Sequence, residues 1–278
     1  MVLCNNFMLK LRTIFVVISI VILCPDLHAI KLTPYIPENN PTKTAVIICP
    51  GGSYFWLDKK AEGEETAMWL RDNGIAAFVL EYRCGGFGAF IFHLRTKGHS
   101  FPAGFEDLRD AIDHVRTNAE KYGISPDRIG CLGYSAGGHL VMHAALQLSG
   151  RQDAMAFVAP IYPVVSMTHK YTHKRSRRGL LGEHPSSDLM DSLSLENHVT
   201  PLCPPVFLMN CDDDPIVHPH NAELLDSALT AHNVPHHYEH YKSGGHGFGV
   251  NLNKTTREAI QWKHKFIDWL YGLMRKEE

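Results

Sequence analysis

Short apolar runs alternate along this chain with longer stretches in which apolar residues recur at helical spacing. The runs typical of buried strands cover residues 44–49, 75–80, 128–132, 155–162 and 204–210, and residues 236–241 are expected to form a further strand. The helical spacing predicts helices at residues 64–71, 103–122, 138–146, 222–231 and 257–274. This alternation predicts an α/β fold, with a mostly parallel central sheet and helices on both faces.

Two segments do not fit the alternation. Residues 84–101 form a glycine-containing stretch that is expected to be a long loop. Residues 166–200 form a polar insertion between two predicted strands. Open parallel sheets bind ligands beyond the carboxyl ends of their strands, so we expect both segments to lie over that edge.

A G-x-S-x-G motif lies between a predicted strand and a predicted helix, at residues 133–137. A sharp strand–turn–helix connection exposes the hydroxyl of its central serine, here Ser135. A side chain at Gly133 or Gly137 would collide with so tight a turn. The context favours a nucleophilic Ser135 over a small-residue turn that only packs a helix on a strand.

The acid and base of a catalytic triad are expected after later strands, in the order Ser, Asp, His. Asp214 follows the strand at 204–210 and His246 lies among four glycines after the strand at 236–241. His246 is the predicted general base, and Asp214 is the predicted acid that orients it. Asp213 is the alternative acid, because three consecutive aspartates occupy this loop.

A glycine-rich turn directly after the strand at 44–49 is the predicted oxyanion loop. Its backbone amides could face the developing oxyanion of an acyl-transfer reaction. Either Gly52 or Ser53 is expected to supply one donor. The amide of Ala136, the residue after the predicted nucleophile, supplies the other.

Together these residues resemble the α/β-hydrolase superfamily, and more closely its small secreted branch of acetyl-xylan-esterase-like and feruloyl-esterase-like hydrolases. The resemblance covers most of the chain after residue 30. It rests on the segments Cys49-Pro50-Gly51-Gly52-Ser53-Tyr54, Glu62-Gly63, Leu80-Glu81-Tyr82-Arg83, Gly133-Tyr134-Ser135-Ala136-Gly137-Gly138-His139, Asp214-Pro215-Ile216-Val217 and Gly244-Gly245-His246-Gly247-Phe248-Gly249. Pro50 and Ser53 stand where related oxyanion loops carry His and Gly, and His218 stands where the acid loop usually carries Pro.

The resemblance implies a serine esterase that removes short acyl groups, such as acetyl, from carbohydrate such as xylan. The alternatives are a peptidase or lipase with the same triad, or a catalytically silent binding protein on the same scaffold. The expected partner is a small-molecule or oligosaccharide ester. Five basic residues of the insertion are expected to be a solvated surface, or alternatively to contact an acidic sugar substituent: Lys170, Lys174, Arg175, Arg177 and Arg178.

Composition narrows the picture further. The 27 Lys and Arg nearly balance the 29 Asp and Glu, which does not indicate a nucleic-acid partner. None of the 18 histidines has supporting ligands at metal-site spacing, so no metal or cofactor is expected. Five cysteines follow residue 29 at irregular spacing, which allows a disulfide but does not indicate a disulfide-stapled scaffold.

The N-terminal residues 1–29 have the pattern of a secretory signal peptide. Lys10 and Arg12 precede a short apolar run, and Ala29 is a small residue at a suitable cleavage position. We therefore expect a catalytic domain at residues 30–278, secreted or periplasmic, without stable membrane insertion after cleavage. An uncleaved anchor, or lipidation at Cys24, is the alternative.

Overall fold

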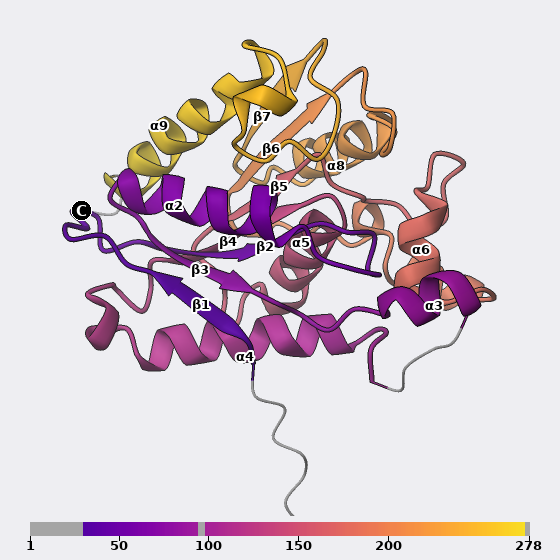
Figure 1. Cartoon of the computed structure of the whole chain (residues 1–278), viewed down its shortest axis with the longest axis horizontal. Helices are drawn as coiled ribbons and strands as arrows, with labels where there is room; N and C mark the ends of the chain where they lie inside the picture. The colour runs from indigo at the N-terminus through magenta and orange to yellow at the C-terminus, as the bar shows by residue number, and fades with distance from the viewer. Residues whose placement is uncertain (1–29, 94–97, 276–278) are drawn as a thin grey trace, which may run out of the picture.

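The structure is a computed structural model that describes residues 30–93 and 98–275 (Figure 1). The predicted signal peptide, residues 1–29, lies outside the described residues. No helix within those two ranges has the length and apolar content needed to cross a bilayer.

A seven-stranded sheet forms the centre of the molecule, in the order β1-β3-β2-β4-β5-β6-β7 (Figure 1). The strands are β1 (Leu32–Tyr35), β2 (Ala45–Cys49), β3 (Ala76–Leu80), β4 (Ile129–Tyr134), β5 (Val158–Ile161), β6 (Val206–Cys211) and β7 (His236–Tyr241). Only β1, at the edge, runs antiparallel to its neighbour, and the other pairs are parallel. The α/β-hydrolase fold class predicted from the sequence is confirmed.

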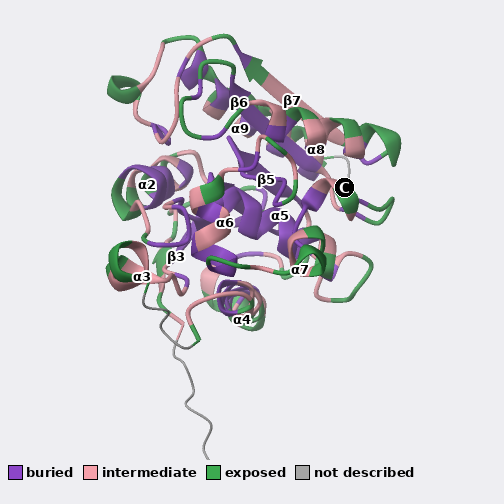
Figure 2. Ribbon diagram, turned by 90° about the vertical axis from the view of Figure 1, so that its right-hand side faces the viewer, coloured by how far each residue is buried: buried purple, intermediate pink, exposed green. Residues whose placement is uncertain are grey.

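Helices cover both faces of the sheet. The helices are α2 (Glu65–Asp72), α3 (Gly86–Phe92), α4 (Ala103–Thr117), α5 (Ala136–Leu148), α6 (Lys174–Leu181), α7 (Ser187–Asp191), α8 (His220–Ala231) and α9 (Trp262–Arg275). The apolar sides of α4, α5 and α8 pack on one face, and those of α2 and α9 pack on the other. Neighbouring β2 residues divide between the two cores, Ile47 with the first and Ile48 with the second, which explains why the central strands are apolar throughout. Figure 2 shows strands in the middle of the molecule, such as β5, in the purple of buried residues.

The structure differs from the sequence prediction mainly in short elements. The helix predicted to reach residue 122 ends at Thr117, and a separate 3-10 turn follows at Glu120–Tyr122. The edge strand β1 has no predicted counterpart, because it is only partly buried and contains Pro34. The two irregular segments contain short helices, α3 in residues 84–101 and α6 and α7 in residues 166–200.

Both of these segments lie against the loop that follows β2. The amides of Gly85 and Gly86 donate to the carbonyl oxygens of Tyr54 and Phe55, at 2.8 and 2.9 Å. On α6, the backbone of Gly179 approaches Ser53 so closely that a β-carbon there would lie 2.2 Å from the Ser53 carbonyl oxygen. Figures 1 and 2 show α3 and α6 at the same end of the molecule, beyond the carboxyl ends of the strands.

Candidate active site

Ser135 lies at a sharp elbow between β4 and α5, in an unusual backbone conformation with φ 54° and ψ −116°. Glycine is required on both sides of it. A β-carbon on Gly133 would lie 2.2 Å from the carbonyl oxygen of Gly137, and one on Gly137 would lie 2.0 Å from that of Cys49. The turn therefore forms only with these glycines, and it holds Ser135 at the carboxyl edge of the sheet.

A hydrogen-bonded chain joins Ser135 to the loops after β6 and β7. The Nε2 atom of His246 is 2.9 Å from the Ser135 hydroxyl oxygen, and Nδ1 is 2.6 Å from Oδ2 of Asp214. Because the carboxylate can only accept, Nδ1 carries the proton and Nε2 is free to accept the serine proton. The Asp214 side chain is 1% exposed and that of His246 is 10% exposed. The structure thus brings together the three residues predicted as a triad.

The three consecutive aspartates have different partners. Oδ1 of Asp214 accepts from the amides of Ile216 and Val217, at 2.8 and 2.9 Å, which fixes the carboxylate that meets His246. Asp213, the alternative acid, does not reach the histidine, and instead accepts from the amides of Gly244 and Gly245, both at 2.9 Å. Asp213 therefore holds the loop that carries the histidine, and Asp214 is the carboxylate that meets His246.

The loop after β2 approaches Ser135 through its backbone. A β-carbon on Gly51 would lie 2.9 Å from that of Ser135. The Gly51 amide is occupied, since it donates to Oε2 of Glu62 at 2.7 Å. The amides of Gly52 and Ser53 have no acceptor in the described part of the chain, and that of Ala136 lies in the first turn of α5, where no intrahelical acceptor exists. Three amides near the serine are therefore available to an oxyanion.

Glu62 connects the two sides of the site, a role that its sequence context did not reveal. It comes from η1 (Lys59–Glu64) and is 2% exposed. Its second oxygen accepts from the Tyr162 hydroxyl at 2.9 Å, and that hydroxyl accepts from the Gly249 amide at 3.0 Å. The Tyr162 ring lies 4.6 Å from that of His246, centroid to centroid. Burial raises the pKa of Glu62, opposed mainly by the nearby His246.

His139, in the first turns of α5, supports the site through two hydrogen bonds. Its Nε2 donates to the Leu193 carbonyl oxygen at 2.9 Å, and its Nδ1 accepts from the Tyr54 hydroxyl at 2.8 Å. It thereby ties α5 to the loop after β2 and to the insertion. Burial lowers the pKa of His139 to about 4, so the ring is neutral at physiological pH.

An open pocket with a volume of about 150 Å³ adjoins Ser135 and His246. Its other lining residues come from the loop after β2, from η1 and its cap, from α6 and from the acid and histidine loops: Gly51, Gly52, Ser53, Trp56, Asp58, Glu62, Arg175, Ile216 and Gly247. Two large apolar side chains, Trp56 and Ile216, are both partly exposed. The pocket is therefore small, and Trp56 and Ile216 are its only large apolar side chains within the described residues.

The described residues contain no group of three or more His, Cys, Asp or Glu side chains placed to hold a metal ion. The five cysteines after residue 29 are all unpaired thiols: Cys49, Cys84, Cys131, Cys203 and Cys211. Burial raises the pKa of Cys203 and of Cys211 to about 12, so neither provides a thiolate at neutral pH. The disulfide that the sequence allowed does not form within these residues.

Known proteins are similar to this chain in sequence and in fold. The chain is 32% identical over 225 residues to an acetylxylan esterase of Xylanibacter ruminicola, and 30% identical over 233 residues to endo-1,4-beta-xylanase B of Butyrivibrio fibrisolvens. Each match covers 79% of this chain but only 44% and 35% of the relative, so the chain spans less than half the length of both.

A crystal structure of the acetyl ester-xyloside bifunctional hydrolase from Caldicellulosiruptor lactoaceticus superimposes with a TM-score of 0.78 and 31% identity, and the match covers 89% of both chains. Residues 32–229, which include the elbow, the loop after β2 and Asp214, match the BD-FAE family. With its fold and its site geometry in agreement, this chain belongs to the BD-FAE family.

Proposed function

We propose that this protein is a serine esterase that removes short acyl groups, acetyl above all, from carbohydrate such as xylan. The observation that carries the proposal is the hydrogen-bonded chain from Asp214 through His246 to Ser135, in a pocket bordered by unoccupied backbone amides. A nucleophile, a base within hydrogen-bond distance and a group that orients the base are the parts that acyl transfer needs.

In the proposed reaction, the Ser135 hydroxyl attacks the ester carbonyl carbon as its proton passes to Nε2 of His246. The carbonyl oxygen becomes an oxyanion and accepts from the amide of Ala136 and from that of Gly52 or Ser53. Collapse of the tetrahedral intermediate breaks the bond to the sugar oxygen, which takes the proton from His246. Water then attacks the acyl-enzyme as His246 takes its proton, and His246 returns that proton to the Ser135 oxygen as the bond to the acyl group breaks and the carboxylic acid is released.

Asp214 has two parts in this scheme. It keeps the proton on Nδ1 of His246, so that Nε2 faces the serine, and it stabilises the imidazolium that forms during each transfer. Because Asp214 is almost fully buried and accepts two backbone amides, it is held in one orientation. It does not take the proton itself.

The carbohydrate part of the proposal is supported by similarity. The relatives include an acetylxylan esterase and a xylanase, and the structural neighbour is named as an acetyl ester-xyloside hydrolase. The pocket agrees with a small acyl group and a polar alcohol, because few of its lining side chains are apolar. Acetylated xylo-oligosaccharides are therefore the first substrates to try.

The purified chain should react with a fluorophosphonate probe at Ser135, identified by peptide mass spectrometry. It should also release acetate from acetylated xylo-oligosaccharides faster than it releases ferulate from feruloylated ones. Absence of labelling would support a silent binding protein. Labelling combined with preferred cleavage of peptides or long-chain triglycerides would support a peptidase or a lipase.

A further inference from the structure

Arg175, the second residue of α6, is a cation beside Ser135 that has no anionic partner in the described residues. It lines the same pocket as Ser135 and His246. Its Nε donates to the Ser53 hydroxyl at 3.0 Å, and its guanidinium carbon lies 5.7 Å from the centre of the Trp56 ring. The two Nη groups have no acceptor within residues 30–93 and 98–275, so the guanidinium is oriented but not neutralised.

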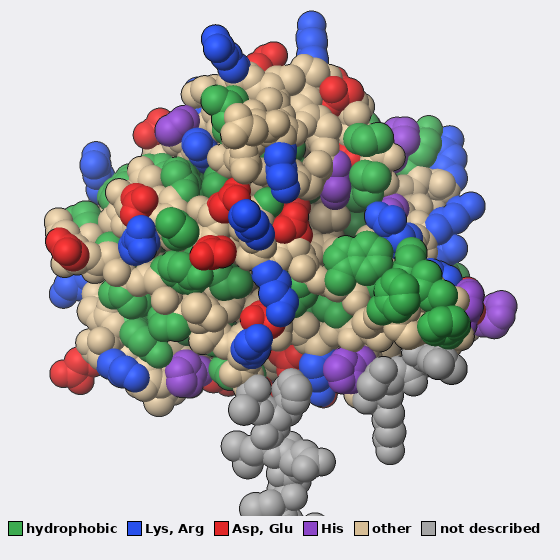
Figure 3. Space-filling view, in the orientation of Figure 1, with side chains coloured by type: hydrophobic (Ala, Val, Ile, Leu, Met, Phe, Trp, Pro, Cys, Tyr) green, Lys and Arg blue, Asp and Glu red, His purple; other side chains and the backbone are tan. Residues whose placement is uncertain are grey.

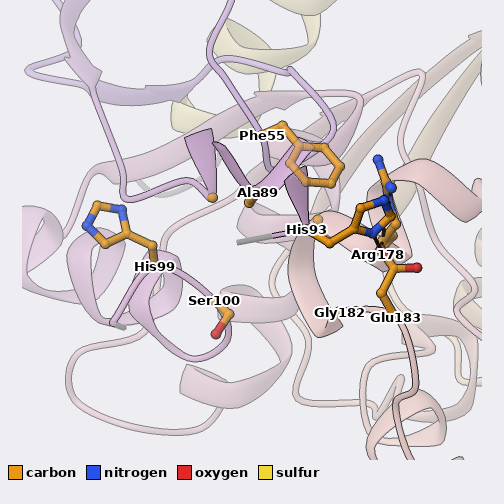
Figure 4. Close-up of a pocket in the computed structure, with 10 residues that line it drawn as sticks. Phe55, Ala89, His93, His99, Ser100, Arg178, Gly182 and Glu183 are labelled. Carbon is orange, nitrogen blue, oxygen red and sulfur yellow. Dashed lines mark hydrogen bonds and ion pairs between the residues drawn. The ribbon is translucent and has the colours of Figure 1, made fainter. Parts of the chain in front are cut away.

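Other arginines of the same helix are already engaged. Arg178 lies 3.4 Å from Oε1 of Glu183 and donates to the Phe90 carbonyl oxygen at 3.1 Å, beside the neighbouring hollow drawn in Figure 4. Arg177 donates to the Met167 carbonyl oxygen at 3.0 Å. Among the three arginines of α6, Arg175 is thus distinguished by its place in the pocket of Ser135 and His246.

Two carboxylates also line the pocket, and they limit where an anion can bind. Glu62 already accepts from the Gly51 amide and the Tyr162 hydroxyl, and Asp58 accepts from the Ala61 amide at 3.0 Å. Both belong to η1 or its cap, and neither forms an ion pair with Arg175. A negatively charged substrate group would be repelled near these residues, so the favourable position for it is at α6.

We propose that Arg175 binds a carboxylate on the carbohydrate part of the substrate, so that the enzyme prefers esters of acidic, uronate-bearing oligosaccharides. This inference rests on the proposed function. An acetyl group is uncharged, and therefore the carboxylate must belong to the sugar. A guanidinium with two free donors matches a carboxylate in geometry and charge. The adjacent ring of Trp56, which is 42% exposed, offers an apolar face for the sugar.

The surface around Arg175 agrees with an extended ligand of this kind. Figure 3 shows hydrophobic side chains gathered beside lysine and arginine side chains at the end of the molecule that carries α3 and α6. Exposed Phe87, Ile91 and Phe92 of α3 belong to this region of the chain, and Phe90 contacts Trp56 with ring centres 5.1 Å apart. An oligosaccharide held at Trp56 could continue over this surface.

The competing role for Arg175 is positional, because its hydrogen bond to Ser53 could fix the oxyanion loop. The two roles differ in their dependence on substrate charge. A positioning residue affects every ester alike, whereas a residue that binds a carboxylate changes the ratio between acidic and neutral substrates. The informative quantity is therefore the ratio of kcat/KM for acidic to neutral acetylated oligosaccharides.

The test compares the wild type with Arg175→Gln and Arg175→Lys, and uses Lys174→Gln as the matched control with the same charge change on the same helix. Substrates are 4-nitrophenyl acetate, neutral acetylated xylo-oligosaccharides and acetylated xylo-oligosaccharides that carry glucuronic acid. We expect Arg175→Gln to lower the acidic-to-neutral ratio about tenfold at low salt, and Arg175→Lys to lower it less. Lys174→Gln should leave it unchanged, and added salt should reduce the wild-type ratio.

Three results would overturn the inference. Equal losses on all three substrates would assign Arg175 to positioning through Ser53. A wild-type ratio near one, or a ratio unaffected by Arg175→Gln, would show that no substrate carboxylate binds there. If the wild type hydrolysed no acetyl ester at all, including 4-nitrophenyl acetate, the proposed esterase function would fail, which is distinguishable from failure of this inference alone.

Discussion

The hydroxyl of Ser135 is the single atom group on which the proposed chemistry depends. Ser135→Ala removes it from a buried elbow in which alanine fits, so the fold should persist. We expect the turnover of acetyl esters to fall at least ~10⁴-fold, as in other enzymes with this arrangement. The measurement is hydrolysis of 4-nitrophenyl acetate, with a circular dichroism spectrum as the check on folding. Retention of a tenth of the activity would rule out the serine as nucleophile.

Asp214 and Asp213 are neighbours with different hydrogen-bond partners, which makes them a matched pair for mutation: Asp214 meets His246, and Asp213 accepts from backbone amides of the histidine loop. Asp214→Asn places an amide against Nδ1 of His246 and should disturb the tautomer, which lowers kcat by ~10⁴-fold in other triads. Asp213→Asn keeps an oxygen that can accept from Gly244 and Gly245, so its effect should be small. Steady-state kinetics of both variants decide the point. A larger loss of kcat for Asp213→Asn than for Asp214→Asn would indicate that Asp213, and not Asp214, is the acid of the triad.

Glu62 positions the site without touching the substrate carbonyl in the proposed mechanism. Glu62→Gln keeps the size of the side chain but replaces one acceptor oxygen with an NH2 donor, so it can no longer accept from both the Gly51 amide and the Tyr162 hydroxyl. A lost buried hydrogen bond costs about 1–3 kcal/mol, so we expect kcat to fall about tenfold or more with little change in KM. The exposed Glu64→Gln is the control. A change in KM alone would contradict a positioning role.

At the scale of elements, the insertion that contains α6 and α7 limits the acyl group. Its described surface is mostly polar, and Trp56 and Ile216 are the large apolar side chains of the pocket. A long acyl chain needs a continuous apolar wall, because each buried methylene contributes only ~0.8 kcal/mol. We expect kcat/KM on 4-nitrophenyl esters to be highest for acetate or propionate and to drop steeply by octanoate. Preference for octanoate would instead indicate a lipase.

Differences in burial among the helices and strands explain how much of the fold the sequence could predict. Strands such as β2 and β4 are buried on both faces, so their apolar runs identify them without ambiguity. Neither the edge strand β1, whose residues are partly buried or exposed, nor the short helix α3 contains a fully buried residue. Elements that depend on contacts with a distant loop, rather than on their own periodicity, left no pattern to read.

Across the whole molecule, buried histidines should make stability depend on pH. Burial lowers the pKa of His139 to about 4 and that of His143 to about 3, whereas the unfolded chain takes up protons near pH 6.5. The two neutral histidines therefore contribute fully to the free energy of unfolding above pH 6.5, and this contribution is lost as the pH falls toward their pKa values in the folded protein. We expect the free energy of unfolding to drop by about 2 kcal/mol per histidine between pH 7 and pH 5.

Urea unfolding at several pH values measures this loss. His143→Leu removes one of the two groups and should flatten the pH dependence, since the ring packs between Phe101 and Phe105 without a charged partner. The exposed His232→Gln should leave the slope unchanged. A wild-type unfolding free energy that stayed constant from pH 7 to pH 5 would contradict the expectation.

The site itself was only partly readable from the sequence, for a reason that concerns the whole molecule. Ser135, Asp214 and His246 follow strands in a recognisable order, so local motifs locate them. Glu62, Tyr162 and Arg175 acquire their roles from contacts between loops that are far apart in the chain, and no local pattern records such contacts. The unequal partners of Asp213 and Asp214 became clear only in three dimensions.

The backbone conformation of Ser135 implies that this residue lowers the stability of the folded protein. Serine at this position would then be retained for its reactive hydroxyl and at a cost in stability. At φ 54° and ψ −116° a residue with a β-carbon is strained by about 1–3 kcal/mol, whereas glycine is not. Of two inactive variants, Ser135→Gly should therefore melt at a higher temperature than Ser135→Ala, despite the greater flexibility of glycine in the unfolded chain. Equal or reversed melting temperatures in calorimetry would show that the surrounding turn has relaxed to accommodate serine. If Ser135→Gly does melt at the higher temperature, the residue that best fits this turn is one that lacks the hydroxyl needed for the reaction.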